Sequence, residues 1–183
     1  MKKLLLAGIV GVLAVSLLGA TAAMGAPGGK DSPANNNPQN LYLYPKEYSD
    51  APEWTTLWEQ DAWGKYNFKL NGTVISGPFN GHGLAPDTGY TLLSYNDPWG
   101  TAVPQFVVIG SGTSDAEGNV HISGSADLGV DVASPVYDWS GPGDGYKIWL
   151  VLTADITETG FAAWNPGSYL LENNRIGATA SAP

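Results

Sequence analysis

The amino-acid sequence predicts an all-β protein, an antiparallel sandwich or barrel, of which the Greek-key β-sandwich is the favoured form. Eight short apolar runs alternate with clusters of Gly, Pro, Asn and Asp, a spacing typical of strands joined by tight turns. In most runs apolar and polar residues alternate, so one face of each strand is expected to be buried. We expect strands at residues 41–44, 64–70, 72–79, 90–95, 105–109, 119–125, 146–153 and 168–171.

The run at residues 64–70 shows this alternation most clearly. Its side chains divide between an apolar face, with Tyr66, Phe68 and Leu70, and a polar face, with Lys65, Asn67 and Lys69. Because successive side chains of a strand point to opposite faces, this pattern predicts a half-buried strand.

The turn that follows this run is marked by Asn71-Gly72, a favoured two-residue hairpin sequence. Asn71-Gly72-Thr73 is also the single N-glycosylation sequon. We therefore expect a hairpin turn, with Asn71 as a candidate glycosylation site in a host that has the machinery.

The run at residues 146–153 is apolar on both sides. Trp149 lies between Ile148 and Leu150 and therefore points to the opposite face from them. We expect Trp149 to be core if both faces of this strand are covered, and part of a surface stripe if one face is open.

Residues 51–60 contain the strongest helix candidate. Pro52 suits a first helical turn, and Trp54, Leu57 and Trp58 would share one helical face. We expect the tryptophans of this segment to serve packing.

The segment from Leu84 to Tyr90 has the pattern Leu-x-Pro-x-Thr-x-Tyr. It resembles the tyrosine corner of fibronectin-type and related Greek-key sandwiches. The resemblance implies that Pro86 fixes a turn, and that Tyr90 buries its ring while its hydroxyl group bonds the backbone upstream.

The first residues have the features of a secretory signal peptide. Lys2 and Lys3 precede seventeen uncharged residues, and Ala20-Thr21-Ala22 fits the Ala-x-Ala cleavage pattern. We assign residues 1–22 to the signal peptide; cleavage one or four residues later is an alternative. An uncleaved N-terminal anchor is the rival interpretation, since about 17 apolar residues suffice to span a bilayer.

The remaining chain divides into a linker, one domain and a tail. Residues 23–40 are expected to form a flexible linker, because the part from residue 26 has three prolines and no aliphatic residue larger than Ala. Residues 41–177 are the length of one domain and are assigned to the β-sandwich. Residues 178–183 are small and polar and are expected to be a disordered tail.

Composition excludes several classes of function. The 183 residues include no Cys, which excludes disulfides, thiolate nucleophiles and iron–sulfur clusters. The chain has 17 acidic residues against 8 Lys and Arg, a net charge of -9. Nucleic-acid binding depends on clustered basic residues, so this balance argues against a nucleic-acid partner.

A set of motifs between Leu41 and Ile176 resembles a group of uncharacterised secreted archaeal and bacterial proteins. The motifs are Trp63-Gly64-Lys65, Phe79-Asn80-Gly81-His82-Gly83-Leu84-Ala85-Pro86, Asp97-Pro98-Trp99-Gly100, Gly110-Ser111-Gly112-Thr113, Gly118-Asn119-Val120-His121-Ile122-Ser123-Gly124, Lys147-Ile148-Trp149-Leu150-Val151-Leu152 and Trp164-Asn165-Pro166. This resemblance implies a secreted domain and no particular activity.

A second likeness is to copper–zinc superoxide dismutase, whose sandwich also has a Gly-Leu-x-Pro turn and an acidic hairpin like residues 113–119. The metal site of that enzyme needs many histidines, and this chain has two, His82 and His121. They lack the spacing of a metal-binding pair, so we expect no metal and no cofactor. We expect His82 to bond a backbone group of its turn, and His121 to lie on the accessible face of its strand.

Two acidic loops invite comparison with calcium sites. Asp115, Glu117 and Asn119 alternate, but no bidentate Glu follows at the required position. A hairpin turn is therefore the favoured interpretation. The same holds for Asp138 and Asp144, which flank a Gly-Pro-Gly sequence.

Two loop tryptophans are candidates for ligand binding. Trp99 follows Asp97-Pro98 and Trp139 precedes a Gly-rich turn, so either indole could be exposed. Sugar rings stack on exposed aromatic faces, and we therefore name Trp99, Asp97, His82 and Trp139 as the candidate ligand-binding residues.

These observations predict a secreted, non-catalytic interaction domain, extracellular or at the cell surface. The alternative is a polysaccharide-binding module, and a secreted hydrolase is less favoured. The expected partner is a polysaccharide or another surface protein, with no nucleic acid and no membrane after signal cleavage. Two acids converging in an aromatic cleft would favour the hydrolase, whereas aromatic residues without paired acids would favour binding.

Overall fold

The computed structural model describes residues 39–48, 54–97, 105–129, 132–136, 145–172 and 175–178. Within these ranges the chain forms strands and two short 3₁₀ helices, with no α-helix. The strands are β1 (Gln39–Tyr44), β2 (Lys46–Tyr48), β3 (Trp54–Thr56), β4 (Trp63–Asn71), β5 (Val74–His82), β6 (Gly89–Asp97), β7 (Val107–Thr113), β8 (Val120–Asp127), β9 (Val132–Val136), β10 (Gly145–Leu152), β11 (Leu170–Glu172) and β12 (Arg175–Ala178). The prediction of an all-β fold is confirmed.

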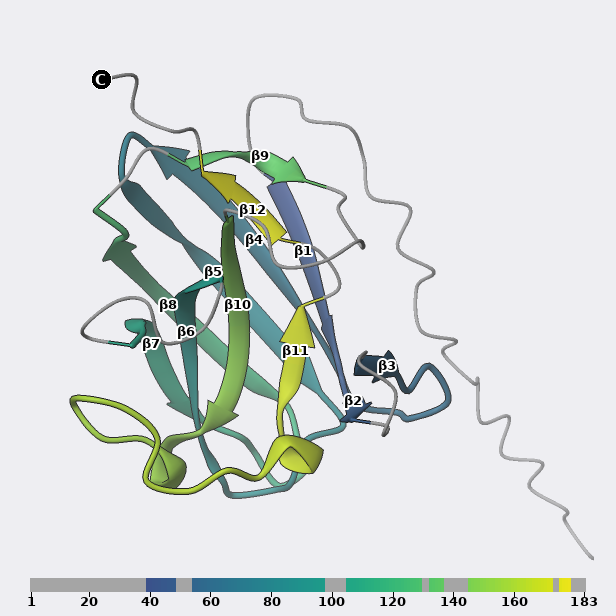
Figure 1. The fold of residues 1–183 in the computed structure, drawn as a ribbon. Helices are drawn as coiled ribbons and strands as arrows, with labels where there is room; N and C mark the ends of the chain where they lie inside the picture. The colour runs from purple at the N-terminus through teal and green to yellow at the C-terminus, as the bar shows by residue number, and fades with distance from the viewer. Residues whose placement is uncertain are drawn as a thin grey trace, which may run out of the picture.

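Ten of the strands form one antiparallel sheet (Figure 1). Its order is β7-β6-β10-β11-β1-β4-β5-β8, and β12 pairs with both β10 and β9. The sheet curls until its end strands, β7 and β8, pack against each other, although they are not neighbours in its hydrogen-bonded order. The result is a nearly closed barrel, beside which β2 and β3 form a separate hairpin.

Glycines allow β7 and β8 to approach so closely. A Cβ atom on Gly124 would overlap the carbonyl oxygen of Ile109, and one on Gly110 would lie 2.9 Å from Cγ2 of Ile122. Without side chains at these positions, the two backbones can pack directly on each other. We call this contact the glycine seam.

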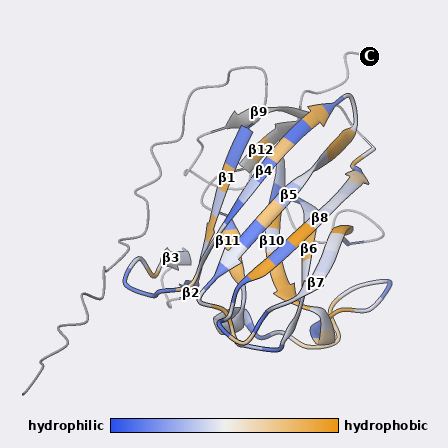
Figure 2. Ribbon diagram, turned by 180° about the vertical axis from the view of Figure 1, so that it is seen from behind, coloured by the Kyte–Doolittle hydropathy of each residue, from blue (hydrophilic) through white to orange (hydrophobic). Residues whose placement is uncertain are grey.

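The curled sheet encloses an inner core. It is filled by the apolar positions of the alternating strands, including Leu41, Leu43, Tyr66, Phe68, Ile75, Phe79, Tyr90, Leu92, Ile122, Ile148 and Leu150. Tyr66 and Phe68 are fully buried, as the alternation in β4 predicts. The hydropathy of β4 and β5 alternates along their length (Figure 2), because their other faces point outward.

A second cluster, the outer core, covers the opposite face of β6, β10 and β11. It consists of Leu93, Tyr95, Phe106, Trp149, Val151, Tyr169 and Leu171. Trp149 is only 7% exposed, so both faces of β10 are covered and Trp149 is core. The cover comes from the connection between β10 and β11, seen below the barrel in Figure 1.

The predicted tyrosine corner is present. The ring of Tyr90 is 1% exposed, and the backbone N–H of Ala85 donates to its hydroxyl oxygen at 3.2 Å. Ser114 completes the arch by donating from its hydroxyl group to the carbonyl oxygen of Ala85 at 2.6 Å. The local pattern from Leu84 to Tyr90 was therefore sufficient to predict this contact.

The predicted helix at residues 51–60 is wrong in the described part of that segment. Trp54–Thr56 forms β3, which pairs with Lys46–Tyr48, and a turn follows it. Aromatic and β-branched residues favour strands, and cross-strand pairing with β2 outweighs the helical spacing of the apolar residues.

The predicted hairpin between β4 and β5 is confirmed. Asn71 pairs with Val74, which leaves Gly72 and Thr73 as the two loop residues, one position later than the Asn-Gly interpretation. Gly72 has φ 58°, and a positive φ at the first loop residue explains the glycine.

The glycine seam predicts that Gly124→Ala destabilises the barrel strongly. The added methyl group meets backbone atoms, which can move only if β7 and β8 separate. We expect the free energy of unfolding in urea to fall by about 3 kcal/mol. Gly167→Ala is the matched control, since its Cβ would have no heavy atom within 4 Å. Equal stability of the two variants would contradict the seam.

Candidate functional site

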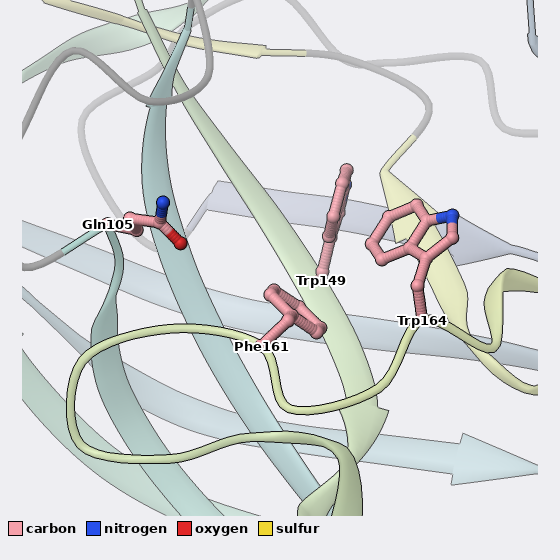
Figure 3. Close-up of a pocket in the computed structure, with 4 residues that line it drawn as sticks. All are labelled: Gln105, Trp149, Phe161 and Trp164. Atoms are coloured by element: carbon pink, nitrogen blue, oxygen red, sulfur yellow. The ribbon is translucent and has the colours of Figure 1, made fainter.

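An aromatic pocket opens on the outer face of β10 (Figure 3). Its volume is about 330 Å³, and it is lined by Gln105, Trp149, Phe161 and Trp164. Small-molecule sites in proteins range from about 300 to 1,000 Å³, so this pocket has the size of a compact ligand site. We call these four residues the pocket residues.

Three elements bring the pocket residues together. Trp149 stands on β10, Phe161 and Trp164 come from the connection between β10 and β11, and Gln105 lies two residues before β7. The two ring systems of Phe161 and Trp164 meet edge to face, with centroids 5.3 Å apart and planes at 78°. Trp149 lies 5.5 Å from Trp164. This packing fixes the indole of Trp164 while leaving the residue 47% exposed.

The backbone of the connection is held in a compact shape around Asp155. The N–H groups of Ala162 and Ala163 donate to the carbonyl oxygen of Asp155 at 2.8 and 3.2 Å. Ile156 and Phe161 form an isolated β-bridge. These contacts place Phe161 over β10 before any ligand binds.

The carboxylate of Asp155 holds the other half of the connection. Its Oδ2 atom accepts a hydrogen bond from the Tyr169 hydroxyl group at 2.6 Å and one from Nδ2 of Asn165 at 2.9 Å. The N–H of Asn165 in turn donates to the Tyr169 hydroxyl oxygen at 3.1 Å. Burial and the Asp155 carboxylate raise the pKa of Tyr169, so its hydroxyl group stays protonated as a donor. Trp164, next to Asn165, is thereby anchored to the outer core.

The aromatic surface continues beyond the pocket onto the β2–β3 hairpin. Trp54 lies 6.3 Å from Trp164, and Tyr48 lies 5.3 Å from Trp54. Tyr48 is 62% exposed. The hairpin therefore extends the aromatic rim of the pocket toward solvent.

A buried carboxyl group, that of Glu172, lies near Lys46, Lys147 and Trp149. Glu172 is 5% exposed, and burial raises its pKa to about 7, although the positive charges of Lys46 and Lys147 and an interaction with the Trp149 indole lower it. Burial also lowers the pKa of Lys46. Neither Glu172 nor Asp155 is among the described residues that line the pocket.

Of the predicted ligand-binding residues, His82 is not among the described residues that line this pocket. Trp99 and Trp139 lie outside the described residues, as do Asp138 and Asp144. Asp97 ends β6, where its backbone pairs with Gly145. His82 is on β5, separated from β10 by β11, β1 and β4.

The interpretation of His82 as bonded to a backbone group of its turn is wrong. Its Nδ1 atom lies 2.9 Å from Oδ1 of Asn119, a side chain that the loop between β7 and β8 brings alongside. His121 is exposed on β8, as predicted. Among the described residues, no group of three or more His, Asp or Glu side chains is placed to hold a metal ion.

The acidic segment at residues 115–119 is a hairpin turn, as predicted. Oδ1 of Asp115 accepts hydrogen bonds from the N–H groups of Glu117 and Asn119 at 3.1 and 2.7 Å. These bonds lower the pKa of Asp115. Its carboxylate is thus used to close the turn.

The sequence analysis missed Gln105, Phe161 and Trp164 as site residues. A signal was present for two of them, since Phe161 and Trp164 lie between Gly160 and Pro166, in a segment without strand alternation. Large aromatic residues in such a connection must cover an apolar face or remain exposed. No local signal distinguishes Gln105.

No protein-family model, curated protein or solved structure matches this chain. No helix among the described residues is long and apolar enough to cross a membrane.

The buried Glu172 predicts a pH-dependent stability. Its pKa of about 7 in the folded protein exceeds the ordinary 4.5 of the unfolded chain, so folding favours the protonated form. This contribution is complete below pH 4.5 and is lost as the pH rises through 7. The free energy of unfolding of the wild type, relative to that of Glu172→Gln, should fall by about 3 kcal/mol over this range.

Urea denaturation at a series of pH values measures this difference. Glu117→Gln, at an exposed position, is the control and should track the wild type at every pH. A difference between wild type and Glu172→Gln that does not vary with pH would show that Glu172 ionises normally in the folded state.

Proposed function

We propose that this protein is a secreted, non-catalytic extracellular domain that binds carbohydrate in the aromatic pocket. The observation that carries this proposal is the composition of the pocket: three aromatic rings and one amide, with no carboxyl group among its described lining residues. Secretion is supported by the signal-peptide pattern of residues 1–22.

The chemistry of a sugar ring suits the pocket residues. The C–H faces of a pyranose are apolar and pack on aromatic faces, while its edge carries hydroxyl groups. The amide of Gln105 offers an acceptor and two donors, enough to bond adjacent hydroxyl groups. The half-exposed indole of Trp164 would stack on the ring from outside, and Trp149 would form the floor.

The roles of the two acids that are buried in the described part of the chain support binding over hydrolysis. A glycosidase needs two carboxyl groups about 5 to 9.5 Å apart, facing the scissile bond. Asp155 is engaged by Tyr169 and Asn165, and Glu172 lies among Lys46 and Lys147. Each acid therefore has a structural role.

A protein partner at the cell surface is the second candidate. The observation in its favour is the exposure of Tyr48 and Trp58, which are 62% and 50% exposed on and beside the β2–β3 hairpin. Aromatic residues are enriched in protein interfaces. This candidate places the binding residues on the hairpin.

Depletion of the mature protein by insoluble polysaccharides and native cell envelopes tests the proposal. We expect one polymer to bind the wild type and Trp164→Ala to weaken this binding about 30-fold, because truncating a central aromatic anchor costs about 2 kcal/mol. Unbound protein is measured by its tryptophan absorbance.

Trp58→Ala is the matched control, since it removes an equally exposed indole that packs on Tyr44 away from the pocket residues. It should bind like the wild type. Loss of binding in Trp58→Ala with retention in Trp164→Ala would move the site to the hairpin and favour the protein partner.

A further inference from the structure

The outward face of β1, β4, β5 and β8 forms a second surface, on strands that contribute none of the pocket residues. These four strands are adjacent in the sheet and lie side by side in Figure 2. Their outward positions carry amides, hydroxyl groups, rings and bases. We call this surface the polar face.

The register aligns these side chains in rows across the strands. Tyr42 pairs with Lys65, Lys65 with Asn80, and Asn80 with His121, so four adjacent strands each contribute one outward side chain to a single row. Pro78 and Ser123 pair in the next row. Directly opposite side chains are close enough to contact a common ligand.

Hydrogen bonds fix polar groups of the row that contains Asn80 and His121. Nδ1 of His121 lies 2.8 Å from Oδ1 of Asn80, and Nε2 of His121 lies 3.1 Å from the hydroxyl oxygen of Ser123. The imidazole is thereby held by one contact across to β5 and one within its own strand, β8. Fixing these side chains in advance reduces the entropy lost when a ligand binds.

Three rings follow one another along the edge of the same face. Tyr42 lies 6.4 Å from Trp63, with the planes at 34°, and Trp63 lies 4.7 Å from His82, at 35°. The ammonium group of Lys65 stands 5.6 Å from the centre of the Tyr42 ring. The rings and the base thus form one aromatic, positively charged strip.

The charge of the polar face is opposite to that of the chain. The whole sequence has 17 acidic residues against 8 Lys and Arg. Among the described outward strand positions, the polar face carries two bases, Lys65 and Lys69, and one acid, Asp127 at the end of β8. Asp115 borders the face, where Nδ2 of Asn119 donates to its carboxylate at 3.2 Å. Bases gathered on one face of an acidic protein attract an anionic partner.

We propose that the polar face binds an anionic polysaccharide, as an extended surface distinct from the pocket. This inference rests on the proposed carbohydrate binding and adds the class of polymer. A sugar chain fits better than an acidic peptide, because the face offers planar rings for stacking beside its hydrogen-bonding groups. Lys65 and Lys69 pair with the acid groups, the amide nitrogen of Asn80 donates to hydroxyl groups, and Tyr42 and Trp63 stack on sugar rings.

The test compares the binding of alginate, a carboxylated polysaccharide, and dextran, a neutral one. The double variant Lys65→Gln/Lys69→Gln should bind alginate about five-fold more weakly than the wild type, since two exposed charge contacts are lost. Lys65→Arg/Lys69→Arg keeps both charges and should bind within about two-fold of the wild type. Circular dichroism and thermal unfolding verify that both variants are folded.

Salt and a competitor complete the test. Raising the NaCl concentration should weaken alginate binding more in the wild type than in the Gln double variant, because salt screens the two charges. Polyglutamate should compete poorly with alginate. Equal competition by polyglutamate, unchanged binding in the Gln double variant, or no alginate binding by the wild type would each overturn the inference.

The outcomes separate this surface from the pocket. If Trp164→Ala binds every polymer normally while the Gln double variant loses alginate, the pocket proposal fails and the polar face stands. If Trp164→Ala loses binding while the Gln double variant retains alginate, the polar face fails and the pocket stands.

Discussion

The fold depends on strand β10, which must be buried on both of its faces. Ile148 and Leu150 point into the inner core, while Trp149 and Val151 point to the outside of the barrel. Without a cover on that outer side, these two apolar side chains would be exposed to water. The connection between β10 and β11 folds back to cover them, and Asp155 holds it there through its backbone and its carboxylate. Because the cover is made of large rings that cannot fill all the space, it leaves the pocket. The proposed site is thus a consequence of how the second face of β10 is buried.

Much of the fold could be predicted, because its signals are local. Alternation along residues 64–70 fixes the two faces of β4, and the sequence from Leu84 to Tyr90 specifies its own hydrogen bond. The prediction failed at residues 51–60, where the pairing of β3 with β2 is a contact that no helical spacing reveals. The closure of the sheet could not be predicted from the sequence. The role of Gly110 and Gly124 is recognisable only once β7 and β8 are seen to pack against each other.

The proposed binding surfaces were harder to predict, because the sheet topology brings together residues that are distant in the sequence. Gln105 and Trp164 are far apart in the sequence, and the order of the sheet alone brings them to one pocket. The same holds for the row across β1, β4, β5 and β8, where each strand contributes one residue. The residue types, aromatic rings and amides, could be recognised from the sequence, and His82 was selected from them. In the structure His82 lies on the polar face, beside Trp63, and not in a loop.

The central claim is that the covering of β10 creates a carbohydrate site, and nuclear magnetic resonance tests it most directly. A soluble oligosaccharide from the polymer that depletes the protein is titrated into ¹⁵N-labelled protein, and the indole and glutamine side-chain signals are followed. The account predicts that the Nε1–H signals of Trp149 and Trp164 and the amide of Gln105 shift together at one saturating concentration, while that of Trp58 stays in place. Shifts confined to Trp99 and Trp139, with the pocket residues unchanged, would contradict it.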